Sequence, residues 1–267
     1  MIHTLLRNID CFVFDMDGTL YLGDSVLPGA HELIELLEKR DIKYYYFTNN
    51  SSRSPREYIK RLENLGFVPP SADKIMTSGH VMIHYIKNHY SDPCVFLCGT
   101  PALQEQFKEA NITLLPYDAK KADAVVIGFD TTMDYIKADN ACRLISGGAD
   151  FLATNIDRVC PLDNGRYMLD CGSMCKMIEH ATGVQPKFTG KPFAETVDYI
   201  LNKAGSERAK TALVGDRLYT DIMTAVNGDL VSIAVLSGEV TLDELKQSNI
   251  KIDYILDGVK DIYDSLL

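Results

Sequence analysis

The sequence predicts an α/β protein built on a doubly wound parallel sheet, with a second α/β domain inserted into it. Short apolar segments typical of buried strands alternate with segments of helical periodicity, which favours a parallel sheet covered by helices on both faces. This alternation occurs at both ends of the 267-residue chain and again, separately, in its middle. Polar residues also follow several of the apolar segments directly, at the sheet edge where ligands of such folds bind.

The N-terminal part has a β-α-β pattern. An apolar run at residues 11–14 ends at Asp15 and Gly18, as expected of a buried strand that leads into a turn. Pro28 and Gly29 open a segment whose apolar residues recur at helical spacing. Residues 43–47 then form the second predicted strand.

Residues 54–66 carry a full set of helix boundary signals. Ser54 is a typical N-cap, Pro55 fits the first helical position, and Glu57 stands where a capping box places its acidic residue. Gly66 supplies the residue that ends many helices. We therefore predict a helix between these two ends.

The C-terminal part resumes the alternation. The predicted elements are a helix at 195–204 ended by Gly205, a strand at 211–214, a helix from about Asp221, a strand at 230–236, a helix capped by Thr241 with Glu244, and a strand at 252–256. Together with the N-terminal part they complete one sheet.

The middle of the chain has elements enough to bury a core of its own. They are strands at 95–97, 124–127 and 151–153, a helix after Thr100 and Pro101, a helix at 135–145, and a helix that ends at Gly183. We predict a discontinuous domain from residues 1–77 and 186–267, with an inserted domain at residues 78–185. A single long sheet is the alternative.

Composition and charge exclude several classes of protein. The 46% hydrophobic content is ordinary for a globular protein, and the net charge of −10, without a cluster of Lys and Arg, opposes nucleic-acid binding. There is no apolar run of the roughly 18 residues that a membrane-spanning helix needs, and no basic segment with an apolar stretch at the start. We expect a cytoplasmic protein without a membrane partner. Its seven cysteines, odd in number, favour reduced thiols.

The strongest chemical pattern follows the first predicted strand. Asp15 and Asp17 are two residues apart, so on extended backbone their carboxylates would lie on the same side. Like charges this close raise a pKa or require a cation such as Mg2+. One carboxylate could serve as a nucleophile and the other as a proton donor. An acidic turn with a helix-capping aspartate is the other interpretation.

Other strand ends supply complementary groups. Residues 48–51 offer hydroxyls, amides and backbone N–H groups suited to phosphate oxygens, or form an ordinary Asx-type loop. Lys191, between Gly190 and Pro192, fits a fixed cationic group, although a surface lysine is the commoner case. Asp216 fits a metal ligand, and Asp221 fits either a ligand or a helix cap. Together these groups indicate phosphoryl transfer.

These four segments resemble the four ordered motifs of the haloacid dehalogenase (HAD) superfamily. They are Asp15-Met16-Asp17-Gly18-Thr19-Leu20, Thr48-Asn49-Asn50, Gly190-Lys191-Pro192, and Gly215-Asp216 with Thr220-Asp221. The doubled asparagine, the inserted domain, and Ala153-Thr154-Asn155-Ile156-Asp157 within it resemble the NagD-like phosphatases, which carry a large α/β cap on a Rossmann-like core.

The resemblance implies a role for each carboxylate. Asp15 would attack the phosphorus and form an aspartyl-phosphate, while Asp17 would protonate the leaving alkoxide and then activate water. Asp15, the backbone carbonyl of Asp17, and Asp216 would hold Mg2+, with Asp221 supporting that shell. Dehalogenases of the superfamily lack the second aspartate of the first motif, so Asp17 favours phosphate chemistry.

The resemblance also implies how substrate is held. Thr48, Asn49 and Lys191 would bind the phosphoryl oxygens, with Asn50 beside them, and residues 21–28 would form a flap that gates the site. In the cap, Asn155 and Asp157 stand in a loop that faces the phosphate in the resembling family; a polar turn is the alternative. That subfamily carries proline after the asparagine, where this chain has Ile156, so no specific substrate is implied.

We therefore predict a Mg2+-dependent phosphatase that hydrolyses a small-molecule phosphomonoester, such as a sugar phosphate or a related metabolite. Two alternatives remain. One is a phosphotransferase or mutase that uses the same aspartyl-phosphate, and the other is a signalling or binding protein in which Asp15 accepts phosphate without turnover. A homodimer formed through the cap is a further expectation.

Overall fold

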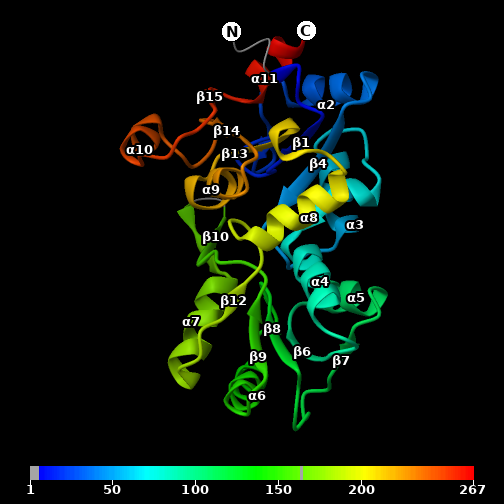
Figure 1. The fold of residues 1–267 in the computed structure, drawn as a ribbon, viewed down its shortest axis with the longest axis vertical. Coiled ribbons are helices and arrows are strands. Elements are labelled where there is room, and N and C mark those ends of the chain that lie inside the picture. The colour runs from blue at the N-terminus through cyan, green and yellow to red at the C-terminus, as the bar shows by residue number, and fades with distance from the viewer. Residues whose placement is uncertain (1–5, 163–164) are drawn as a thin grey trace. The chain divides into compact units, whose positions relative to one another are not determined.

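The computed structural model describes residues 6–162 and 165–267, which form two compact units (Figure 1). The first comprises residues 6–48, Tyr58–Met76 and Lys191–Leu267, and the second comprises Asn49–Glu57 and Thr77–Gly190. The second unit thus includes the predicted insertion and, in addition, the segment from Asn49 to Glu57. Residues 1–5 and 163–164, which the predicted domain ranges include, lie outside the described residues.

The first unit is built on a six-stranded sheet in the order β15-β14-β13-β1-β4-β5. Its strands are β1 (Cys11–Phe14), β4 (Lys43–Thr48), β5 (Ile75–Thr77), β13 (Thr211–Gly215), β14 (Val231–Val235) and β15 (Tyr254–Leu256). β1 lies between β13 and β4 and pairs with both in parallel, as β14 does with β13 and β15. The predicted parallel sheet is therefore confirmed, and its first strand is central.

Both faces of this sheet are covered. The helices are α2 (Ala30–Lys39), α3 (Pro55–Asn64), α8 (Ala194–Ala204), α9 (Met223–Asn227), α10 (Leu242–Gln247) and α11 (Val259–Leu266). Helices α2 and α11 lie side by side (Figure 1) and bury apolar side chains in one core with Ile233 of β14. The next residue, Ala234, packs with Ile222 in another core, because successive strand residues point to opposite faces.

The second unit has a five-stranded parallel sheet in the order β12-β9-β8-β6-β7. Its strands are β6 (Cys94–Cys98), β7 (Thr113–Leu114), β8 (Ala124–Ile127), β9 (Asp150–Ala153) and β12 (Lys187–Phe188), and its helices are α4 (Ser78–His89), α5 (Pro101–Glu109), α6 (Tyr135–Ser146) and α7 (Cys171–Thr182). Phe96, Phe107 and Phe129 are buried in its cores, so this unit encloses apolar side chains of its own.

Local sequence signals set the helix boundaries as predicted. The Ser54 N–H donates to Glu57 Oε2 at 2.7 Å, which forms the acidic half of the capping box before α3. Thr241 and Glu244 form the same motif before α10. Gly66, Gly183 and Gly205 end their helices with positive φ values, which glycine adopts without steric cost.

Short and irregular elements differ from the prediction. Two hairpins, β2 (Tyr21–Leu22) with β3 (Ser25–Val26) and β10 (Val159–Pro161) with β11 (Tyr167–Leu169), have strands too short to show a hydrophobic period. The helix predicted from about Asp221 instead begins with a π turn, Leu218–Ile222, and Asp221 lies within that turn. Asp221 is therefore not the N-cap residue, although its Oδ2 accepts from the Arg217 N–H that precedes the turn, at 3.2 Å. None of the described helices is long and apolar enough to cross a membrane.

Candidate active site

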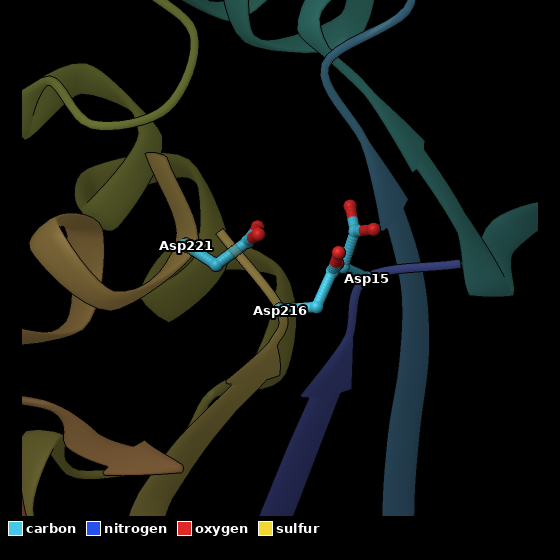
Figure 2. A group of neighbouring side chains, drawn as sticks. All are labelled: Asp15, Asp216 and Asp221. Atoms are coloured by element: carbon cyan, nitrogen blue, oxygen red, sulfur yellow. The ribbon is translucent and has the colours of Figure 1, made fainter. Parts of the chain in front are cut away.

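Three aspartates meet at the carboxyl ends of neighbouring strands in the first unit. Asp15 follows β1, Asp216 follows β13, and Asp221 comes from the π turn beyond it. Figure 2 shows their carboxylates converging, and one ligand oxygen from each lies within 4.8 Å of the others. Three oxygen donors at this spacing fit a hard divalent cation. The group thus brings together three of the predicted metal-site residues.

Lys191 is buried against two of these carboxylates. Its Nζ lies 2.6 Å from Asp15 Oδ1 and 2.5 Å from Asp221 Oδ1, and it also donates to the Phe47 carbonyl at 3.3 Å. Burial would lower the pKa of this lysine, but Asp15 and Asp221 more than offset that effect and raise it. Lys191 is therefore a permanently charged group in the site and not a surface lysine.

The pKa values of the carboxylates show that the site has an excess of negative charge. Burial raises the pKa of Asp15, and Asp221 and Asp216 add to that effect, while Lys191 opposes it. Burial and Asp221 raise the pKa of Asp216 to about 6, although the Glu239 N–H donates to its Oδ2 at 2.8 Å. The positive charges of Lys191 and Arg217 do not cancel these effects, so a bound cation would stabilise the charged forms of Asp15 and Asp216.

Glycines allow the backbone to pass close to Asp216. A Cβ on Gly18 would lie 2.3 Å from Asp216 Oδ2, and a Cβ on Gly238 would lie 2.0 Å from the same atom. The segment that contains Gly238 also contacts the loop after β1, because the Ser237 hydroxyl donates to the Gly18 carbonyl at 2.8 Å. Sequence reasoning missed this segment, although its position just after the strand predicted at 230–236 could have indicated it.

Asp17 lies outside the three-carboxylate group, and its side chain is exposed. It forms a β-bridge with Tyr21, and the Gly18 N–H donates to the Tyr21 carbonyl at 2.7 Å, so the predicted flap begins in contact with this aspartate. Arg61 of α3 holds the β2–β3 hairpin through the Gly23 carbonyl at 2.7 Å and lies over the Tyr21 ring.

The predicted phosphate-binding residues 48–50 divide between the two units. Thr48 ends β4 in the first unit and is half-buried, whereas Asn49 belongs to the second unit and is 8% exposed. Asn50 Oδ1 accepts from the Ser52 N–H at 2.8 Å, which is the Asx turn considered as an alternative. Binding of phosphate by these residues stays a prediction.

The two predicted cap residues lie together with Asn49 in the second unit. Asn155 and Asp157 are 0% and 3% exposed, and the amide nitrogens of Asn49 and Asn155 donate to Asp157 Oδ2 at 2.7 and 3.0 Å. Asn155 also donates to Asp170 Oδ1, the side chain that caps α7. These contacts form a polar network within the unit, and direct contact with substrate stays a prediction.

The fold and the acidic, lysine-containing site define an α/β enzyme with a carboxylate-based centre, and sequence comparisons identify its family. Residues 12–113 match the model of the haloacid dehalogenase-like hydrolases, and residues 188–262 match a second model described as HAD-hydrolase-like. An acid sugar phosphatase from Staphylococcus haemolyticus is 31% identical over 91% of this chain and 91% of its own length. The chain belongs to the haloacid dehalogenase-like hydrolase family.

Comparison with solved structures supports the same family. A 4-nitrophenylphosphatase from Thermotoga maritima is 36% identical with a TM-score of 0.92, covering 98% of this chain and 99% of that one. NagD from E. coli K-12 is 25% identical with a TM-score of 0.88, covering 95% and 98% of the two chains. The resemblance to NagD-like phosphatases is therefore confirmed across nearly the full length of the chain.

Proposed function

We propose that this protein is a Mg2+-dependent phosphatase that hydrolyses small phosphomonoesters, sugar phosphates or related metabolites, through an aspartyl-phosphate intermediate. The chain is a hydrolase of phosphoric monoesters, as its family and relatives indicate. The metal, the intermediate and the substrate class are our additions. The observation that carries them is the arrangement of Asp15, Asp216 and Asp221 around the buried ammonium of Lys191.

In the first step a carboxylate oxygen of Asp15 forms a bond to phosphorus while the bond from phosphorus to the ester oxygen breaks. Asp17, which is exposed next to the flap, donates its proton to the departing alkoxide. Lys191 fixes the orientation of Asp15 and neutralises charge on the transferred group. Mg2+ held by Asp15, Asp216 and the Asp17 carbonyl, with Asp221 in support, would neutralise the remaining charge on the phosphoryl oxygens.

In the second step Asp17, now ionised, takes a proton from water as that water attacks phosphorus. The bond between phosphorus and Asp15 breaks, inorganic phosphate is released, and Asp15 regains its carboxylate. Asp17 regains its proton in the same step, so the cycle closes. We assign Thr48, Asn49 and Asn50 to binding of the phosphoryl oxygens, because hydroxyl, amide and backbone N–H donors at the end of β4 suit that group.

The test is phosphate release from a panel of esters with Mg2+ or with chelator. The panel contains sugar phosphates, nucleoside 5'-monophosphates and 4-nitrophenyl phosphate, since similar proteins are named acid sugar phosphatase, 5'-nucleotidase and 4-nitrophenylphosphatase. We expect Mg2+-dependent release that is lost in Asp15→Asn, with folding retained. Release by Asp15→Asn at the wild-type rate would remove Asp15 from the mechanism.

The same panel separates the alternatives. Phosphate delivered to an added alcohol or sugar and not to water would indicate a phosphotransferase. A stable phosphoprotein with no catalytic release would indicate a phospho-accepting binding protein. The homodimer formed through the inserted domain and the cytoplasmic location stay predictions, and sedimentation of the purified chain tests the dimer.

A further inference from the structure

The segment after the second motif is tied into the second unit by its own side chains. The Ser51 hydroxyl lies 3.0 Å from Thr154 Oγ1 and accepts from the Phe129 N–H at 2.9 Å. The Ser52 carbonyl accepts from the Thr100 hydroxyl at 2.8 Å. These bonds connect residues up to 103 positions apart and are largely buried, so the segment is held as part of that unit.

Asn49 begins this segment, and its backbone carbonyl and its side-chain amide are held by different partners. The Ser78 hydroxyl donates to the Asn49 carbonyl, while the Asn49 amide nitrogen donates to Asp157 Oδ2 at 2.7 Å. On the other side a Cβ at Gly190 would lie 2.8 Å from Asn49 Oδ1 and 2.3 Å from the Thr154 carbonyl, so only glycine leaves room for the amide. The side chain of Asn49 is thereby fixed in one orientation.

Asp157 is itself held rigidly. Its Oδ2 accepts from the Asn155 amide as well as from Asn49, and its backbone carbonyl accepts from the Gly172 N–H at 2.8 Å in the first turn of α7. Asn155 in turn donates to Asp170 Oδ1 at 3.1 Å, the cap of that helix. A carboxylate that is 3% exposed and anchored to a helix start is suited to hold a partner and not to follow a mobile substrate.

We propose that Asp157 is a positioning residue that orients the amide of Asn49 for phosphate, with Asn155 fixing Asp157. The inference rests on the proposed function, in which Asn49 binds the phosphoryl group. An amide nitrogen carries two hydrogens, so one bond to Asp157 sets the direction of the other. The cap loop then affects phosphate affinity through Asn49, and its residues need not touch the substrate.

The experiment measures the Kd of inorganic phosphate by 31P NMR titration with Mg2+ present, which requires no turnover, alongside KM for the best ester. Asp157→Ala removes the carboxylate that accepts from the Asn49 amide, so Kd and KM should each rise about tenfold, the factor that corresponds to about 1.4 kcal/mol. Asp157→Asn keeps a carbonyl oxygen in the same place and should restore both values to within about threefold of wild type.

Asp134→Ala is the matched control. Asp134 also belongs to the second unit and caps a helix, since its Oδ1 accepts from the Lys137 N–H at 2.8 Å, but within the described residues it makes no hydrogen bond to the Asn49 segment. This variant should lower the Tm without changing the Kd of phosphate. If Asp157→Ala binds phosphate as tightly as wild type, or if Asp134→Ala weakens binding equally, the inference is wrong.

Ester hydrolysis and phosphate binding are separate measurements, so a failure of the proposed function can be distinguished from a failure of this inference. A wild-type protein that binds phosphate but hydrolyses no ester would overturn the phosphatase, and the Kd series of the Asp157 variants would still decide the positioning role. A wild-type protein that binds no phosphate with Mg2+ present would overturn the inference itself, because Asn49 would then have no phosphate to contact. Loss of binding in Asp157→Asn as large as in Asp157→Ala would also overturn it.

Discussion

Replacing Lys191 with methionine removes the ammonium group that lies between Asp15 and Asp221. Methionine keeps the length and most of the apolar stem, so the change deletes the ammonium and its three donors while disturbing the packing little. The side chains of Lys191 and Asp221 are each 1% exposed, and that of Asp15 is 13% exposed. Water therefore cannot readily replace the lost partner.

The magnitude follows from this burial. Removing one member of a buried ion pair costs roughly 3–5 kcal/mol, because the remaining charge is left unpaired in a low-dielectric site. At roughly 2–4 °C per kcal/mol for a protein of about this size, the Tm should fall by about 6–20 °C. The surface substitution Lys246→Met removes an exposed lysine from α10 and should change the Tm by about 1 °C or less.

Calorimetric melting of both variants, without metal, from pH 8 to pH 5.5 tests this reasoning. Burial raises the pKa of Asp15 and Lys191 opposes that rise, so without Lys191 the carboxyl takes up a proton more readily as the pH falls. The Tm difference between wild type and Lys191→Met should therefore be largest at pH 8 and become smaller toward pH 5.5. If the Tm falls by less than about 2 °C at pH 8, or if the Tm difference from wild type grows on acidification, the argument is refuted.

Three further predictions concern the carboxylates. Asp17→Asn should slow turnover by about 10²–10⁴ with little change in Tm, since Asp17 is exposed; an unchanged steady-state rate would exclude it as acid and base. Folding raises the pKa values of Asp15 and Asp216, so the metal-free folded protein favours their protonated forms. The stability that these two groups contribute is therefore fully present below about pH 4 and is lost as the pH rises through the folded pKa, which is about 6 for Asp216. Mg2+ should thus raise the Tm more at pH 8 than at pH 5, and equal shifts in differential scanning fluorimetry would contradict this. Gly238→Ala puts a Cβ 2.0 Å from Asp216 Oδ2 and should weaken the binding of Mg2+ at least about tenfold, as measured by calorimetric titration. In the control Gly258→Ala the nearest atom to the new Cβ is 4.0 Å away, so Mg2+ should bind as in the wild type. Equal affinities in the two variants would exclude the steric effect.

The sequence determined the elements and the types of chemical group. Caps such as Ser54 with Glu57, and terminal glycines such as Gly205, act within one helical turn, so their effect is visible in the order of residues. The apolar run before Asp15 likewise predicted β1 and the carboxylate at its end. Such local features need no knowledge of which strands pair.

Only the tertiary structure decided which of these groups meet. Asp216 lies beside Asp15 because β1 pairs with β13 in a register that no local pattern specifies. Lys191 reaches Asp15 across 176 positions of sequence and also donates to the Phe47 carbonyl of β4, the other neighbour of β1. The π turn that carries Asp221 packs against β13 and β14, and Gly238 approaches Asp216 because the loop after β14 donates to Asp216 through the Glu239 and Val240 N–H groups. Asn49 joins Asp157 across 108 positions for the same reason, since side chains far apart in sequence meet only where sheet order and buried volume bring their backbones together.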